Sequence, residues 1–253
     1  MSHETHLNSL PEQLQSIDEL IKTTSLEVSQ QLLSPEQLQT MANIDEDAVK
    51  DELLRSEIMD IVGVVAGVKP SAIINHTDHL AHSLSDLNLT HHELLDISGG
   101  SSMTISRSEP LAKELAGKFQ ELWSPHYSNN DEIHRSIGKM LGYPKTSTDY
   151  FLERSPTVGG PFDDQLPVIR PIELENVARS HFCQLILSPD HWREELESYA
   201  VPLETATREL APKSYKYFER EARRNKVADG LRKLIGRQPR SGFNVNVAIS
   251  RVT

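Results

Sequence analysis

The stretch Asp131–Arg154, which reads DEIHRSIGKMLGYPKTSTDYFLER, constrains the fold of this chain more than any other. Its first half is apolar at the spacing of a helix that buries one face. The apolar positions are Ile133, Ile137, Met140 and Leu141. Gly142 can adopt the left-handed conformation that ends a helix, and Pro144 suits the first turn of the next one. The sequence therefore predicts two helices joined by a tight Gly-Tyr-Pro turn.

Reactive side chains gather around this turn. The candidate site residues are His134, Arg135, Tyr143, Lys145, Thr146 and Ser147. His134 lies at the edge of the apolar face, one turn before Gly138. A glycine inside a helix costs about 1 kcal/mol relative to alanine, so Gly138 indicates that another backbone or a ligand approaches closely.

The chemistry of these residues predicts a ligand site. His134 is expected to carry a proton near neutral pH, and Arg135 or Lys145 to hold an anion. The hydroxyl-rich start of the second helix offers free backbone N–H groups to that anion, although the same hydroxyls can serve only as helix caps. We therefore expect a pocket around His134–Pro144 that binds a small anionic ligand or performs simple acid–base chemistry. The sequence identifies no cofactor and no metal ligands there.

The core of the block resembles an uncharacterised family of archaeal and related microbial proteins, a domain of unknown function. The family core reads His-Arg-x-(Ile/Leu)-Gly-x-x-Leu-Gly-Tyr-Pro-x-Cys-Cys, followed by an aromatic pair. Residues 134–144 and 150–151 match this pattern, and looser similarity covers Val64–Ile74 and Phe182–Tyr217. The resemblance implies a shared fold and carries no assigned activity.

One departure from the family pattern bears on chemistry. The two family cysteines are replaced here by Thr146 and Ser147. Thiol chemistry or thiolate metal binding is therefore not expected in this chain.

A second interpretation is a nucleic-acid-binding or regulatory protein. Gly138, Leu141 and Gly142 are spaced as in a DNA-binding helix-turn-helix. The C-terminal segment 213–240 also carries ten basic and three acidic side chains. The alternative is that this basic segment packs against residues 1–65, which carry 13 acidic and three basic side chains. A third interpretation is a purely structural interaction module.

The rest of the chain reads as a helix-rich α+β scaffold, with a small mixed or antiparallel sheet of three to five strands covered by helices. A helix is predicted to begin at Ser34-Pro35, and one long helix to run from Asp45 to about Ala66. A further helix from Ser188 is expected to kink or break at Pro202. The predicted strands are residues 103–106 after a Gly99-Gly100 turn, Phe182–Leu187 and residues 243–249. We divide the chain into a helical extension, 1–44, and a single domain, 45–253, with a Pro/Gly-rich loop at 155–171.

Composition excludes several protein classes. A single cysteine, Cys183, excludes an internal disulfide framework and an all-cysteine metal site, and it favours a reducing, cytoplasmic location. The first residues lack a secretory signal, and the longest apolar run, Ile61–Val68, is far shorter than the roughly 20 residues that span a bilayer. We therefore expect no membrane partner. The net charge of −11 argues mildly against a general nucleic-acid binder. Nothing in the sequence determines the oligomeric state.

The histidines at His76, His79 and His82 recur every three residues. Imidazoles on one helix face can bind zinc. Three steps of three residues drift round the helix, however, so the three rings converge poorly. We interpret them as a solvated polar face.

Overall fold

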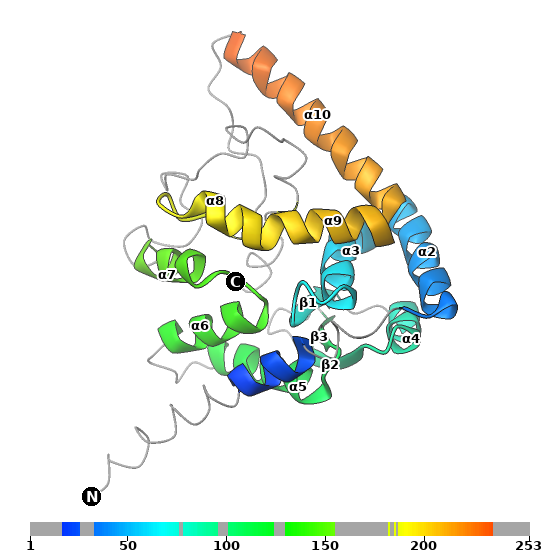
Figure 1. The fold of residues 1–253 in the computed structure, drawn as a ribbon, viewed down its shortest axis with the longest axis vertical. Coiled ribbons are helices and arrows are strands. Elements are labelled where there is room, and N and C mark those ends of the chain that lie inside the picture. Colours follow the sequence, from blue (N-terminus) through cyan, green and yellow to red (C-terminus); the bar gives the residue numbers. More distant parts are fainter. Residues whose placement is uncertain are drawn as a thin grey trace, which may run out of the picture.

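The computed structural model has a helix-rich α+β fold in which helices surround a small antiparallel sheet (Figure 1), as the sequence predicts. The structure describes residues 17–25, 33–75, 78–95, 101–123, 130–154, 182, 185 and 187–234. At residues 78, 79, 95, 130, 154 and 225–234 only the backbone is described. The helices are residues 17–25, α2 (Pro35–Lys50), α3 (Glu52–Val65), α4 (Asp78–Asp86), α5 (Glu109–Leu122), α6 (Asn130–Met140), α7 (Lys145–Arg154), α8 (Trp192–Glu195), α9 (Val201–Leu210) and α10 (Pro212–Leu234).

The sheet contains three antiparallel strands in the order β1-β3-β2. They are β1 (Ser71–Asn75), β2 (Thr90–Leu95) and β3 (Ser101–Ser106). In the β2–β3 hairpin Leu95 lies opposite Ser101, and in the β1–β3 pair Ser71 lies opposite Ser106. The strand predicted at residues 103–106 is therefore confirmed, and its hairpin partner is β2. The Gly99-Gly100 turn lies outside the described residues.

Each face of the sheet packs against a separate set of helices. Ala72, Ile74, Met103 and Ile105 join the core that α2, α3, α4 and α9 build. On the other face Ile73 and Leu94 join the core of α5 and α6. Strands with both faces covered are apolar at successive positions, which explains the Ala-Ile-Ile run of β1.

The helix predicted from Asp45 to Ala66 is instead two helices, because Asp51 ends α2 and begins α3. Asp51 has an extended backbone, with φ −108° and ψ 118°. Its carboxylate accepts hydrogen bonds from the N–H groups of Leu53 at 2.8 Å and Leu54 at 3.3 Å. An aspartate that caps the next helix in this way competes with continuation of the first.

Helix α2 begins where the sequence predicts, after Ser34, and it starts with a capping box. Ser34 Oγ accepts from the N–H of Gln37 at 3.3 Å, and the Gln37 side chain accepts from the Ser34 N–H at 3.0 Å. The predicted division between residues 44 and 45 falls inside α2. That division stays a prediction.

The helix before Pro202 widens by one residue rather than breaking. Residues Leu196–Ala200 form a π-helical turn, labelled η4, between α8 and α9. The N–H of Val201 donates to the Leu196 carbonyl, five residues back. Proline has no N–H to donate, and the wider turn directly precedes Pro202 in the first turn of α9. The segments α8, η4 and α9 form one long rod (Figure 1).

The predicted strand at Phe182–Leu187 is wrong at the positions that the structure describes. Phe182, Leu185 and Leu187 are buried in the larger core, but none of them lies in a strand. A short apolar run signals burial without fixing the backbone conformation. Cys183, the loop at 155–171 and the strand predicted at 243–249 lie outside the described residues.

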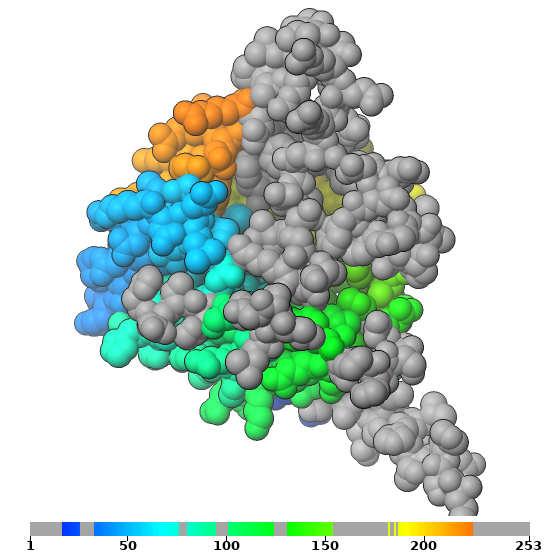
Figure 2. Space-filling model, turned by 180° about the vertical axis from the view of Figure 1, so that it is seen from behind, coloured from blue at the N-terminus to red at the C-terminus, as the bar shows by residue number. Residues whose placement is uncertain are grey.

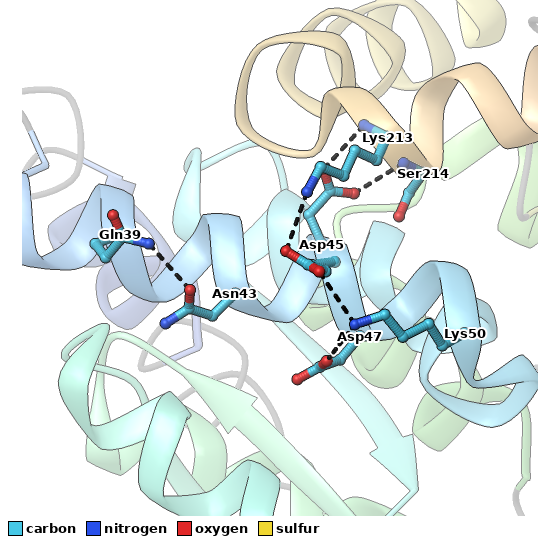
Figure 3. A network of polar contacts seen from close by, with 8 residues as sticks. Gln39, Asn43, Asp45, Asp47, Lys50, Lys213 and Ser214 are labelled. Carbon is cyan, nitrogen blue, oxygen red and sulfur yellow. Dashed lines mark hydrogen bonds and ion pairs between the residues drawn. The ribbon is translucent and has the colours of Figure 1, made fainter.

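The acidic N-terminal and basic C-terminal segments meet where α2 contacts α10 (Figures 2 and 3). The buried carboxylate of Asp45 accepts from the backbone N–H groups of Lys213 at 2.9 Å and Ser214 at 2.8 Å. Asp45 therefore caps the first turn of α10. The Lys213 ammonium adds an ion pair with Glu46 at 3.2 Å. Packing between the two segments, one of the two interpretations of the charge asymmetry, is thus confirmed at their contact.

Within the described ranges, no helix combines the length and the apolar character needed to cross a membrane.

Candidate functional site

The predicted helix–turn–helix unit is present as α6 and α7. Gly142 has φ +78°, the left-handed conformation expected of it. The N–H of Gly142 donates to the Lys139 carbonyl at 3.1 Å, and the N–H of Tyr143 donates to the Gly138 carbonyl at 2.8 Å. This pair of bonds satisfies carbonyls that the end of α6 would otherwise leave free.

The close approach that Gly138 indicates comes from α7. A Cβ atom at Gly138 would lie 2.7 Å from the hydroxyl oxygen of Thr148. Thr148 in turn donates to the Pro144 carbonyl at 3.3 Å. Gly138 therefore lets the two helices cross closely, and a neighbouring side chain fills the gap.

His134 packs against α7. Its ring makes an edge-to-face contact with Phe151, with 5.5 Å between ring centres. Burial lowers the pKa of His134 below its usual value, and Asp131 opposes part of this effect. The imidazole is therefore neutral at pH 7, the form that can accept a proton.

Arg135 and Lys145 share a carboxylate on the surface. Arg135 Nε lies 3.1 Å from Asp149, and the Lys145 ammonium also contacts Asp149. The side chains of Arg135 and Lys145 are 47% and 86% exposed. Hydrogen bonds from Lys145, and then from Arg135, lower the pKa of Asp149. Arg135 and Lys145, which the sequence predicts to bind a ligand anion, are thus already paired with the carboxylate of Asp149 in α7.

Thr146 and Ser147 follow Lys145 in the first turn of α7, where Thr146 is exposed and faces α8. The Thr146 hydroxyl donates to the buried carboxylate of Glu195 in α8 at 2.6 Å. Glu195 also accepts from the Ser188 N–H at 2.8 Å. Ser147 is buried. The Thr146 hydroxyl at the start of α7 is therefore already hydrogen-bonded to a carboxylate of the protein itself, that of Glu195.

Tyr143 lies apart from these contacts and packs against both hydrophobic cores. Its ring meets Tyr199 of η4 edge to face, with 5.5 Å between ring centres. The ammonium of Lys69 lies 5.8 Å from the Tyr143 ring centre and 5.9 Å from that of Tyr199. Both rings therefore flank one buried cation.

Lys69 and its neighbours form a group that the sequence did not reveal, here called the Lys69 cluster. Its members are Glu57, Asp60, Lys69, Asn75, Tyr143 and Tyr199. The Lys69 side chain is 2% exposed and donates to Asp60, which is 15% exposed. A Cβ at Gly63 would lie 2.7 Å from Lys69 Cδ, so glycine at this position makes room for the lysine stem.

A second carboxylate, Glu57, completes the cluster. Glu57 is buried, and its carboxylate accepts from the Asn75 amide and from the Ser56 hydroxyl at 3.0 Å. Burial alone would favour neutral Lys69. The interaction with Asp60 outweighs it, with smaller contributions from Tyr143 and Glu57, and the pKa of Lys69 is raised above its usual value. The lysine is therefore a permanent cation at physiological pH.

The cluster is assembled from distant parts of the chain. Glu57 and Asp60 come from α3, Asn75 from β1, Tyr143 from the α6–α7 turn and Tyr199 from η4. A Cβ at Gly142 would lie 3.0 Å from Pro70, so the Gly-Tyr-Pro turn lies directly on the Lys69-Pro70 segment. Both segments belong to the stretches that carry the family resemblance.

The six residues predicted for one site therefore do not come together in one pocket. Arg135 and Lys145 meet at Asp149, Thr146 contacts α8, and His134 contacts Phe151. Tyr143 alone joins the Lys69 cluster. The sequence pointed to Lys69 only through its position in Val64–Ile74, the segment with looser similarity to the family. Nothing local marked Glu57, Asp60 or Tyr199, because their meeting depends on the fold.

No group of metal-ligating side chains is present among the residues that the structure describes. His76 lies outside them, and the side chain of His79 is not described. Comparison with protein-family models, curated proteins and solved structures gives no significant match. The family resemblance of the central block stays a prediction.

Proposed function

We propose that this protein binds a small polar ligand at the Lys69 cluster and that Tyr143 exchanges a proton with it. One observation carries the proposal: a lysine that is 2% exposed pairs with Asp60 beneath the rings of Tyr143 and Tyr199. Ionisable groups in such environments occur preferentially at functional sites.

The energetics support a role beyond packing. Removal of an ammonium and a carboxylate from water costs several kcal/mol per ion, and their mutual attraction repays this cost only in part. In other proteins, replacement of a buried ion pair by apolar residues of similar volume is often neutral or stabilising. Lys69 also lies next to the proposed proton carrier, with its ammonium 5.8 Å from the centre of the Tyr143 ring. Tyrosine held in this way is a suitable proton donor and acceptor.

The charges of the cluster indicate the class of ligand. Two carboxylates, Glu57 and Asp60, face one ammonium, Lys69. An excess of negative charge favours an uncharged or cationic ligand over the anionic one expected from the sequence. We therefore propose Tyr143, which lies in the Lys69 cluster, as the proton carrier in place of His134, which lies outside it.

The surface pair at α6–α7 is a weaker candidate. An anion bound by Arg135 and Lys145 would have to compete with Asp149. A DNA-reading role for α7 finds little support either. Of its described side chains only Lys145, Thr146 and Glu153 are exposed, and the first two already bind carboxylates. These contacts leave few groups to read base edges.

A ligand screen with matched tyrosine variants tests the proposal. Tyr143→Phe retains the ring and removes the exchangeable proton. Tyr217→Phe does the same at a tyrosine outside the cluster, whose hydroxyl contacts Glu221 at 3.2 Å. A panel of polyols, amines and small carbonyl compounds would be screened by thermal shift, since a ligand that binds the native state raises Tm. Native mass spectrometry of the purified protein would search for a retained small molecule.

We expect a hit to raise the Tm of wild type and Tyr217→Phe and to have little effect on Tyr143→Phe. Equal shifts in all three proteins would place the ligand elsewhere. No hit and no retained molecule would leave the cluster a structural feature and defeat the proposal.

A further inference from the structure

Helix α10 is fixed to the molecule by its first half. Asp45 caps its first turn, and Phe218 and Ala222 are buried in its next two turns. The guanidinium of Arg55 lies 4.1 Å above the ring of Tyr217. These contacts set the direction in which the helix leaves the molecule.

The second half of α10 continues to Leu234, twelve residues past Ala222. At 1.5 Å per residue this adds about 18 Å of helix. In Figure 1 this half, in orange, extends beyond α2 and α9. The backbone of α10 therefore continues well past the part of the helix whose side-chain contacts are described.

The charge of this helix is opposite to that of the chain. Residues 213–234 carry eight basic and three acidic side chains in a chain of net charge −11. Lys216, Arg220 and Arg224 are exposed and recur every four residues, so they form one stripe along the helix. None of the three forms an ion pair with a carboxylate in the described part of the chain, whereas Lys213 and Arg223 pair with Glu46 and Glu219.

We propose that this stripe binds the phosphate backbone of duplex DNA without reading its sequence. Successive cations lie about 6 Å apart along the axis, close enough to contact neighbouring phosphates. A single helix fits the major groove of B-form DNA, which is about 12 Å wide, and is excluded from the deep, narrow major groove of duplex RNA.

The aromatic residues of α10 argue against single strands as the partner. Binding of unpaired bases uses exposed aromatic rings. Phe218 is buried, Tyr215 stacks on Phe182 with 5.9 Å between ring centres, and Tyr217 lies beneath Arg55. The acidic remainder of the chain repels phosphates, so it orients DNA toward α10 alone.

The test compares two triple variants by fluorescence anisotropy with a labelled, mixed-sequence DNA duplex of about two helical turns. The first is Lys216→Ala, Arg220→Ala and Arg224→Ala combined. The control removes the same charge elsewhere, with Lys22→Ala, Lys113→Ala and Arg193→Ala, all exposed positions. Alanine favours helices, so neither set should unfold the protein, and circular dichroism would verify this.

We expect the α10 triple to weaken binding at least about tenfold and to lower the slope of log affinity against log salt by about 3. The control triple should bind like wild type. Four results would overturn the proposal: no binding by wild type at low salt; equal loss in both triples; tighter binding to duplex RNA or single strands; or binding to phosphatidylserine vesicles in place of DNA.

Discussion

Two charged groups flank the Gly-Tyr-Pro turn, and they differ mainly in their access to water. On the outer side Lys145, 86% exposed, pairs with Asp149 within one helix. On the inner side Lys69, 2% exposed, pairs with Asp60. On the surface a lysine–aspartate pair loses little hydration and contributes little to stability. In the core both ions lose their hydration, and removal of one partner strongly destabilises the fold.

The origin of the two pairs differs as well. Lys145 and Asp149 are four residues apart on α7, so helix geometry alone brings them together. Asp60 and Lys69 meet because the chain reverses after α3 and enters β1. Adjacency in the sequence thus identifies the surface pair, while the pair with the greater energetic effect forms only in the folded chain.

Breaking each pair in turn should give the largest contrast. We expect Lys69→Met to lower the free energy of unfolding by about 3–5 kcal/mol, because the buried Glu57 and the partly buried Asp60 lose their cation. Lys145→Met should change it by no more than about 0.5 kcal/mol. Urea denaturation at neutral pH measures both, and similar losses in the two variants would contradict the comparison.

The contribution of the buried pair should also depend on pH. The folded-state pKa of Lys69 is raised, so its stabilising effect is fully present below the unfolded-state value of about 10.4. It is lost as pH rises through the folded-state pKa.

A second contrast concerns the glycines of α5 and α6. Gly138→Ala should destabilise by about 1–3 kcal/mol, because its Cβ would lie 2.7 Å from the Thr148 hydroxyl oxygen. Gly117→Ala, where a Cβ meets nothing within 4 Å, should stabilise α5 by up to about 1 kcal/mol. Adding Thr148→Ala should recover part of the loss at Gly138. A Gly138→Ala protein as stable as wild type would show that α6 and α7 do not cross as closely as described.

A third contrast compares two acidic residues of α2 shown in Figure 3. Asp45→Ala should cost about 1–2 kcal/mol, because two N–H groups at the start of α10 lose their acceptor. Asp47, which is exposed and contacts only Lys50 at 3.7 Å among described partners, should tolerate alanine within about 0.5 kcal/mol. Thermal denaturation by circular dichroism ranks the two. The reverse order would remove the basis for an anchored α10.

The smallest effect is expected at His134. Because burial lowers its folded-state pKa, the unfolded chain binds a proton more readily, and stability falls as pH drops below about 6.5. His134→Leu removes this source of acid sensitivity. The difference in unfolding free energy between wild type and His134→Leu should therefore change between neutral and mildly acidic pH. Parallel stability curves would indicate that the imidazole is equally hydrated in both states.

Local signals were sufficient for much of the fold. The capping box at Ser34, the left-handed Gly142 and the apolar face of α6 were each predictable from a few neighbouring residues. Predictions failed where two local signals competed. Asp51 reads equally well as a helix interior or a cap, and the run at Phe182–Leu187 reads equally well as a strand or as buried irregular chain.

The sequence by itself determined the class of the fold, the position of the α6–α7 turn and the contrast between acidic and basic segments. These depend on periodicity, on turn residues and on charge, all of which are local. The tertiary structure alone decided which polar groups are buried together. In the folded chain Tyr143 packs beside Lys69, Glu195 accepts a hydrogen bond from Thr146, and Asp45 caps the start of α10. Burial and long-range contact set the strength of an electrostatic interaction, and neither is a property of neighbouring residues in the chain.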